Sequence, residues 1–524
     1  MTAEHRNEMT DGTNSTAPTE NSLPSADAEL LARFGYQQEL PRRLSGFSNY
    51  ALSMSIICIL AGGVTSFSQG LCSVGGAAIG IGWPLVCLFS LIVAATMGQI
   101  ASAFPTAGGL YHWASLLGGR HWGWATAWFN LTGLIAVLAA INVGLVRFAL
   151  GWFLGEVPEI WVGYGVLLVT VVQAMLNHVA LRLTTRLTDF SGWWILGISL
   201  LLTGSLIVFA ADYPWSRLVE FTNFSGAAGG HVWPENQNLW QLFLLGFLLP
   251  AYTLTGFDAS AHVSEETVAA AEQVPRSIIR AVIVSGLAGW IMLVSVVLAI
   301  PDLPVAASKG EQAFVWTIQS VLPRPIAMLL MAGIVLAQFL CGLATVMSAS
   351  RMVYAFARDG GLPFSSRLRH VCPVRQTPVW GIWSIALSAS LLAILVPYST
   401  IAAVCAVLLY ISYVIPTALG FWRHGREWTQ MGPWHLGRAY RPLAAVAVLG
   451  TLGLLIIGVQ PPNDQAIWIV RGLVVWLILQ WVVWTQYRFK GPPLSADMLT
   501  QSPSFANPSA KVASPAQSSL SKED

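Results

Sequence analysis

Long apolar segments recur along almost the whole chain, separated by short polar ones. A helix needs about 20 apolar residues to cross the hydrocarbon core of a bilayer, and twelve segments meet this length. The pattern therefore predicts twelve membrane-spanning helices with no soluble domain between them. The expected spans are 46–66, 83–103, 122–150, 159–178, 190–211, 239–262, 278–300, 325–349, 378–397, 399–421, 442–460 and 466–487.

Composition supports a membrane protein and excludes other classes. Hydrophobic residues make up 55% of the 524 residues and charged residues only 10%, whereas about a quarter of a soluble protein is charged. The net charge of +2 is too small to suggest a nucleic-acid partner. The six cysteines form no CxxC pair, so they are expected to be small apolar residues rather than disulfides or metal ligands.

Polar sequence flanks the apolar segments at both ends. Residues 1–34 and 491–524 are rich in polar and small residues, a composition that cannot bury enough apolar surface to fold alone. We expect a disordered tail at each end. Residues 35–490 would then form one twelve-helix domain.

Basic residues are distributed unevenly between the segments that connect the spans. An even number of spans puts both termini on one side, and that side holds most of the arginines. The opposite side holds few basic residues, namely Arg217, Lys309 and Arg324. The positive-inside rule therefore predicts a multi-pass protein of the cell membrane with both termini in the cytoplasm. Arg147, deep in the third span, is expected to reach the outer interface.

The spans also suggest an internal repeat. Spans one to five occupy about 46–211 and spans six to ten about 239–421, which leaves accessory helices at 442–487. Five is an odd number, so two successive five-span units lie in opposite orientations. Inverted repeats are common in secondary transporters, where the site lies between corresponding interrupted helices. The first span of each unit is therefore the place to look for a break.

Span one contains a glycine pair within the step Ala61-Gly62-Gly63-Val64. Each glycine costs about 1 kcal/mol relative to alanine inside a helix, so the backbone can open here. Open backbone at membrane depth survives only where it is buried in protein or lines a wet cavity. Its free amides could bind a carboxylate. The alternative is a small-residue contact that lets two helices pack closely.

Span six contains Pro250, then Gly256 two residues before Asp258. A carboxylate inside a membrane costs at least about 2.5 kcal/mol and normally marks a transport pathway. Asp258 could bind a substrate amine, pair with His262 one turn on, or cap the half-helix that begins there. Phe257 could cover an amine through a cation–π contact, or simply pack.

Four segments carry a resemblance to a known family: 35–49, 101–114, 255–267 and 350–363. On these segments the chain resembles the amino acid–polyamine–organocation superfamily, and within it the amino acid/choline transporter family of GABA and choline permeases. The resemblance implies an all-α fold of twelve helices with five-plus-five inverted repeats and interrupted helices one and six. It also implies secondary active transport of a small substrate by alternating access.

The resemblance further implies a binding site, because in that family the substrate meets the unwound backbone of the first and sixth helices. Carried onto this chain, the site residues are Ala61, Gly62, Gly63, Val64, Thr255, Gly256, Phe257 and Asp258. The Ala-Gly-Gly step departs from the Gly-Ser-Gly pattern of many amino acid permeases. A choline-like substrate therefore stands beside an amino acid or GABA as an alternative. A polyamine ranks last, because it would need more than one acid.

The coupling ion is not determined by the sequence. Some members of the superfamily carry a lysine in the fifth helix, but residues 190–211 contain none. Thr345 and Ser348 in the eighth span could supply hydroxyls to a sodium site or serve as polar contacts between helices. Proton symport, sodium symport and exchange with a second substrate are the three alternatives.

Functions outside the carrier class fit the sequence less well. An intramembrane enzyme would need several converging reactive groups, and the spans hold essentially one acid; a channel would show polar rings along a pore. The spacing of His262 and Glu265 suits a metal, but no third ligand is evident. The acids at 265–266 are expected to pair with Arg276 or Arg280. We therefore predict a lipid-embedded carrier of a small molecule, with no cofactor, metal or nucleic-acid partner.

Overall fold

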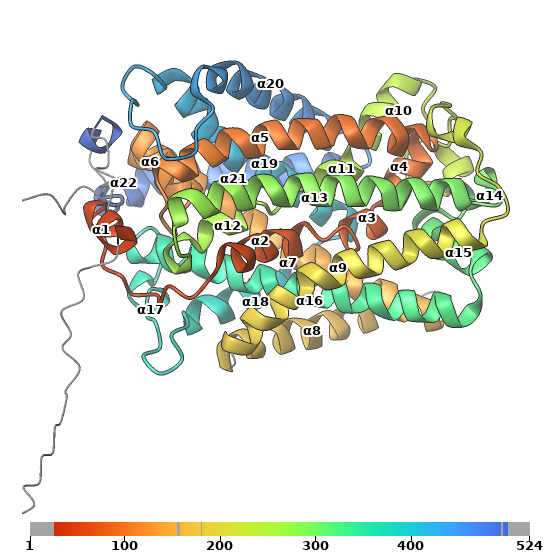
Figure 1. The fold of residues 1–524 in the computed structure, drawn as a ribbon, viewed down its shortest axis with the longest axis horizontal. Coiled ribbons are helices and arrows are strands. Elements are labelled where there is room, and N and C mark those ends of the chain that lie inside the picture. Colours follow the sequence, from red (N-terminus) through yellow and green to blue (C-terminus); the bar gives the residue numbers. More distant parts are fainter. Residues whose placement is uncertain (1–25, 155–157, 180, 494–495, 501–524) are drawn as a thin grey trace, which may run out of the picture.

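The computed structural model describes residues 26–154, 158–179, 181–493 and 496–500 of the chain. The regular elements in these ranges are helices, and most of the long ones run along the long axis of the molecule (Figure 1). Ten of them are long and apolar enough to cross a membrane. Two shorter apolar segments, Leu239–Thr253 and Val379–Leu395, fall where the sixth and ninth spans were expected. The all-α membrane fold predicted from the sequence is confirmed.

The spans of the first unit appear in the expected order. They are α2 (Gly46–Ile57), α3 (Gly62–Thr65), α4 (Phe67–Val74), α5 (Trp83–Ala103), α7 (Arg120–Leu154), α8 (Glu159–Val179) and α9 (Leu181–Phe209). The second unit follows with α10 (Leu239–Gly246), α11 (Leu248–Thr253), α12 (Ala259–His262), α13 (Ala270–Ala299), α16 (Arg324–Arg358), α18 (Val379–Leu395) and α19 (Tyr398–Arg423). Each unit thus begins with a span that is divided into short helices.

The remaining helices lie outside the two units or connect their spans. They are α1 (Ala26–Arg33), α6 (Leu110–Gly118), α14 (Leu303–Ser308), α15 (Ala313–Val321), α17 (Ser365–Leu368), α20 (Tyr440–Gly458), α21 (Asp464–Gln480) and α22 (Gln486–Arg488). Helices α1, α17 and α22 gather at one end of the bundle and α10, α14 and α15 at the other (Figure 1). We call these the α1 end and the α15 end.

Burial separates the core of the bundle from its periphery. The first span is almost entirely buried, whereas α21 exposes most of its surface. Helix α7 packs along α19, and α13 packs against α2 and α5. Since lipid tails are as apolar as leucine, an exposed apolar helix such as α21 is stable at the edge of a membrane bundle. The divided first span therefore lies in the core.

The N-terminal segment is more ordered than its composition predicted. Residues 26–33, expected to belong to a disordered tail, form α1, whose Leu31 is buried in the hydrophobic core. The Asp27 side chain also accepts a hydrogen bond from the Ala269 amide at 2.9 Å. These contacts with residues distant in sequence explain why composition alone failed here. The rest of the expected tail, 1–25, lies outside the described residues, as do 501–524.

Candidate functional site

The break in span six lies where the sequence placed it. Helix α11 ends at Thr253 and α12 begins at Ala259, so the predicted segment Thr255–Asp258 is open backbone. Gly256 has a φ of +95°, and a Cβ on it would lie 2.3 Å from Cγ2 of Ile56. Only glycine tolerates both this backbone conformation and this close approach.

The break in span one lies earlier than predicted. Helix α2 ends at Ile57 and α3 begins at Gly62, so the open turn is Cys58–Ala61 rather than Ala61–Val64. A Cβ on Gly62 would lie 2.8 Å from the Cα atom of Thr253 in α11. The glycine thus permits two helices to pack closely, which was the alternative interpretation. Of the four residues predicted in this break, the first is in the turn and the other three are helical.

The two breaks are in contact with each other. Gly62 of span one packs against Thr253, the last residue before the break in span six. Gly256 within that break packs against Ile56, near the end of α2. Each break therefore places its glycine against the other span, and a small molecule bound between them would touch both.

Helix α16 holds the break in span one through neutral groups. The Gln338 amide donates a hydrogen bond to the Leu60 carbonyl at 3.2 Å, and the Cys341 thiol donates one to the Ile56 carbonyl at 3.4 Å. Backbone groups released from a helix inside a membrane must find such partners. These bonds satisfy two carbonyls that would otherwise be exposed by the break.

Asp258 is fully buried and binds side chains of three elements. Its Oδ1 accepts a hydrogen bond from the Tyr413 hydroxyl at 2.7 Å. Its Oδ2 accepts one from the Asn130 amide at 2.8 Å and lies 3.2 Å from Nε2 of His262. The Tyr413 hydroxyl in turn accepts a hydrogen bond from the Gly256 amide at 3.1 Å. The Asp258 carboxylate thus orients the Tyr413 hydroxyl, which in turn accepts a hydrogen bond from the open backbone at Gly256.

These contacts show which of the structural roles considered for Asp258 and Phe257 are present. The pairing of Asp258 with His262 is present, whereas the Asp258 side chain makes no capping hydrogen bond to α12. The Phe257 ring is buried against Tyr413, with ring centroids 4.8 Å apart. Both side chains therefore stabilise the open backbone of span six in this conformation.

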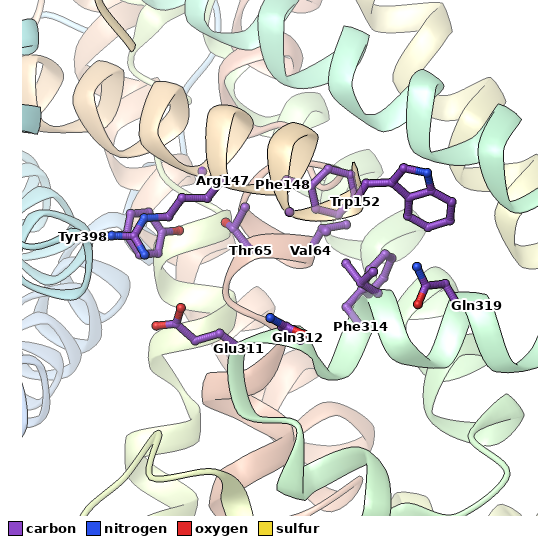
Figure 2. Close-up of a pocket in the computed structure, with 13 residues that line it drawn as sticks. Val64, Thr65, Arg147, Phe148, Trp152, Glu311, Gln312, Phe314, Gln319 and Tyr398 are labelled. Atoms are coloured by element: carbon purple, nitrogen blue, oxygen red, sulfur yellow. The ribbon is translucent and has the colours of Figure 1, made fainter. Parts of the chain in front are cut away.

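A cavity of about 600 Å³ opens at the α15 end beside α3 (Figure 2), within the usual size range of small-molecule sites. Arg147 of α7 and Glu311, just before α15, lie on different sides of it. The Arg147 guanidinium also binds the exposed carboxylate of Glu159 at 2.7 Å. Of the eight predicted site residues, Val64 lines this cavity. The full lining is Val64, Thr65, Gly144, Arg147, Phe148, Gly151, Trp152, Glu311, Gln312, Phe314, Val315, Gln319 and Tyr398.

The α1 end is held together by buried ion pairs. Glu265 binds Arg358 at 2.9 Å, and Glu266 binds Arg351 at 2.8 Å. The predicted partners on α13 are wrong, because Arg276 binds an acid of its own helix. The turn after α12 directs both acids toward α16 instead. Burial raises the pKa of the Glu265 carboxyl, but Arg358 more than offsets this, so the pKa lies below its ordinary value and the pair is charged.

A second cluster at the α1 end converges on Asp359. Its Oδ2 accepts hydrogen bonds from the hydroxyls of Tyr36 and Tyr111, both at 2.9 Å, and lies 3.1 Å from Nε2 of His112. Burial raises the pKa of the Tyr36 hydroxyl, which therefore stays protonated as a donor. The cluster ties the N-terminal segment, α6 and the residue that follows α16 to one another.

Sequence reasoning offered His262 as a partner of Asp258 but missed the other two, Asn130 and Tyr413. Asn130 lies in the third span and Tyr413 in the tenth, far from span six in sequence. The available signal was an amide and a phenol inside otherwise apolar spans, since polar groups at membrane depth seek partners. That signal does not identify which polar groups meet.

Comparisons with known proteins agree with the resemblance seen in the sequence. Residues 44–484 match the family model described as amino acid permease. The amino-acid permease BAT1 of Arabidopsis thaliana is 30% identical, over 88% of this chain and 95% of the relative. Its homologue from Oryza sativa subsp. japonica is 31% identical, over 91% and 100%. The GABA-specific permease of Saccharomyces cerevisiae is 29% identical, over 84% and 79%. The chain therefore belongs to the amino acid permease family.

Proposed function

We propose that this protein is a secondary active transporter that carries an amino acid, or a related small amine such as GABA, across the cell membrane by alternating access. The observation that carries the proposal is the pair of interrupted spans in contact, with α3 in the wall of a cavity at the α15 end. Buried ion pairs join the elements at the opposite end. Access from one side at a time is what a carrier requires.

The substrate site lies between the two breaks, and it comprises the residues implied by the family resemblance. Its members are Ala61, Gly62, Gly63, Val64, Thr255, Gly256, Phe257 and Asp258. Main-chain groups of these segments hold the amino and carboxyl groups of the substrate. Asp258 contributes through its backbone, because its carboxylate binds Tyr413, Asn130 and His262.

The charges of the cavity favour a substrate that carries both signs. Arg147 offers a guanidinium to a carboxylate, and Glu311 offers a carboxylate to an amine. Choline has no carboxylate to bind Arg147, so an amino acid or GABA is the better match. The name of the yeast relative, a GABA-specific permease, points the same way.

The sidedness follows from the basic residues. The α1 end carries the arginine-rich segments, so the positive-inside rule assigns it, with both termini, to the cytoplasm. The cavity at the α15 end then faces the outside, and the structure corresponds to an outward-facing state of the transport cycle.

Counterflow into proteoliposomes tests this function. Vesicles with the purified protein are loaded with an unlabelled amino acid mixture, and uptake of labelled amino acids, GABA, choline and spermidine is measured. We expect saturable uptake of an amino acid or GABA, stimulated by internal substrate and lost in a Gly62→Leu variant that still inserts. Unsaturable flux would indicate a channel, uptake of choline alone would overturn the substrate class, and no uptake of any of them would refute the proposal.

A further inference from the structure

Behind the break in span six lies an ionisable pair at membrane depth. Oδ2 of Asp258 is 3.2 Å from Nε2 of His262, and neither side chain is exposed. The second ring nitrogen of His262, Nδ1, is buried and has no hydrogen-bond partner among the described residues. Histidine is the side chain that proteins most often use to carry a proton. Intramembrane Asp and His residues of this kind mark proton relays.

The other titratable groups around the pair have partners of their own. These are Glu265 with Arg358, Glu266 with Arg351, Glu272 with Arg276, and His112 with Asp359. Helix α19 presents the Tyr413 hydroxyl to Asp258, and α7 presents the neutral amide of Asn130. Helix α2, which also packs against α12, contains no charged residue. Asp258 and His262 therefore form a pair that is separate from these neighbouring ion pairs.

The pair is linked to the open backbone by hydrogen bonds. Tyr413 donates to Asp258 and accepts from the Gly256 amide. A proton on His262 places a positive charge beside the Asp258 carboxylate. This charge weakens the hydrogen bond that the carboxylate accepts from the Tyr413 hydroxyl. The Gly256 amide is then freer to bind a substrate carboxylate. The protonation state of the pair can thus be communicated to the break.

The loop that contains Gly108 and Gly109 lies beside the Asp258–His262 pair. A Cβ on Gly109 would lie 3.6 Å from Nδ1 of His262, and a Cβ on Gly108 would lie 2.5 Å from the ring of His112. The loop therefore contacts both imidazoles. His112 belongs to the cluster on Asp359 that holds the α1 end. If that end opens, displacement of this loop would expose the free nitrogen of His262 to water.

The groups considered for sodium are less suited to bind an ion. The Thr345 hydroxyl donates to the Cys341 carbonyl of its own helix at 2.9 Å. The Ser348 hydroxyl is buried and has no partner among the described residues. One free hydroxyl falls short of the several oxygen ligands that a hard cation needs.

We infer that the Asp258–His262 pair is the proton-binding site that couples transport to a proton gradient, so that substrate and proton cross together. This inference rests on the proposed transport function. The proton comes from water on the side to which the site is open and binds the imidazole. It converts a pair of net charge −1 into a neutral imidazolium–carboxylate pair. It leaves from the imidazole on the other side, and no other bond changes.

Proteoliposomes in sodium-free buffer test the inference with three measurements on full-length protein. These are counterflow without a gradient, accumulation driven by an inside-alkaline gradient, and acidification of an internal pH dye on addition of substrate. For the wild type we expect acidification, and about tenfold accumulation per pH unit if one proton moves with each substrate. His262→Gln should abolish both while counterflow remains measurable. His435→Gln, an exposed control, should behave as the wild type.

The outcomes separate the two proposals. Wild-type counterflow without acidification or gradient-driven accumulation overturns the proton site and leaves the transport function standing. Absence of counterflow in the wild type overturns both. Accumulation that requires a sodium gradient, or full proton coupling in His262→Gln, also overturns the site. If His262→Gln does not fold, Tyr413→Phe replaces it, since it keeps the pair and cuts the link to Gly256. It should lose at least half of the accumulation, and full accumulation in this variant overturns the inference.

Discussion

The breaks in span one and span six touch each other, yet different chemistry holds them. The turn Cys58–Ala61 in span one is apolar, and a neutral amide and a thiol from α16 bind the carbonyls around it. The break in span six is held through Asp258, which binds side chains of α7, α12 and α19. The hydrogen bonds from α16 to the first break are neutral, whereas the second break includes a carboxylate that side chains of three elements bind.

This difference suggests that the two spans have different roles in transport. Neutral hydrogen bonds do not change with pH or with the charge of a substrate, so span one suits a fixed frame that borders the cavity through Val64. A buried carboxylate responds strongly to a nearby charge, because the local dielectric is low. Span six therefore suits the part of the site that changes state, and substitutions in the two spans should have different effects.

The largest effect is expected for Gly256→Ala. The φ of +95° disfavours any side chain, and the new Cβ would lie 2.3 Å from Cγ2 of Ile56. Backbone strain and overpacking together should cost about 3 kcal/mol. We expect uptake to be abolished and the Tm in detergent to fall by several degrees, measured by counterflow and by thermal unfolding.

A second substitution distinguishes the clash from the strain. Ile56→Ala removes the methyl group that Gly256→Ala would strike, so the double variant should recover part of the lost Tm. Recovery to wild-type uptake would show that the left-handed backbone at Gly256 is not required. An unchanged Tm in the single variant would contradict the described contact between the two breaks.

The next largest effect is expected for Gly62→Ala, with Gly204→Ala in α9 as its control. A Cβ on Gly62 would lie 2.8 Å from the Thr253 Cα, which is backbone and cannot turn away. A Cβ on Gly204 would have none of the described neighbouring atoms within 4 Å. Overpacking of about 1–3 kcal/mol should reduce uptake about tenfold or more in the first variant. The control should keep near-normal uptake, and equal losses in both would refute the close contact.

The same glycines show how much of the site the sequence could predict. Span six was placed correctly because Gly256 needs a left-handed backbone and is followed closely by an intramembrane acid, and both are local signals. In span one the glycine pair suggested a break, but Gly62 instead packs closely against Thr253 and Gly63 is helical. The open turn is fixed by hydrogen bonds from Gln338 and other groups of α16. Those partners lie far away in sequence and leave no local signal.

The membrane spans were predictable for a similar reason, and the buried ion pairs were not. Apolar length is a local property that the bilayer imposes on each span separately. The partners of Glu265 and Glu266 depend on the direction of the turn after α12, so arginines on α16 bind them instead of those on α13. Charge pairing between spans follows from packing, which one sequence does not reveal.

A moderate effect confined to binding is expected for Arg147→Gln. If the cavity beside span one receives the substrate carboxylate, loss of a charge-assisted hydrogen bond of about 1.5 kcal/mol should raise KM about tenfold and leave the Tm nearly unchanged. Lys309→Gln at the same end, exposed and outside the cavity lining, is the control. An unchanged KM for every carboxylated substrate would remove Arg147 from the entry path.

The smallest effects are expected for Gln338→Met and Cys341→Ala, which test the neutral hydrogen bonds to span one. The first substitution keeps the length and apolar body of the side chain but removes the donor to the Leu60 carbonyl. A neutral hydrogen bond contributes about 1 kcal/mol, so we expect a Tm lower by about one or two degrees and uptake within about twofold of the wild type. Cys341→Ala should have a still smaller effect, because a thiol is a weak donor. Loss of uptake as large as that of Tyr413→Phe would mean that span one is held as critically as span six, and the contrast between the two breaks would fail.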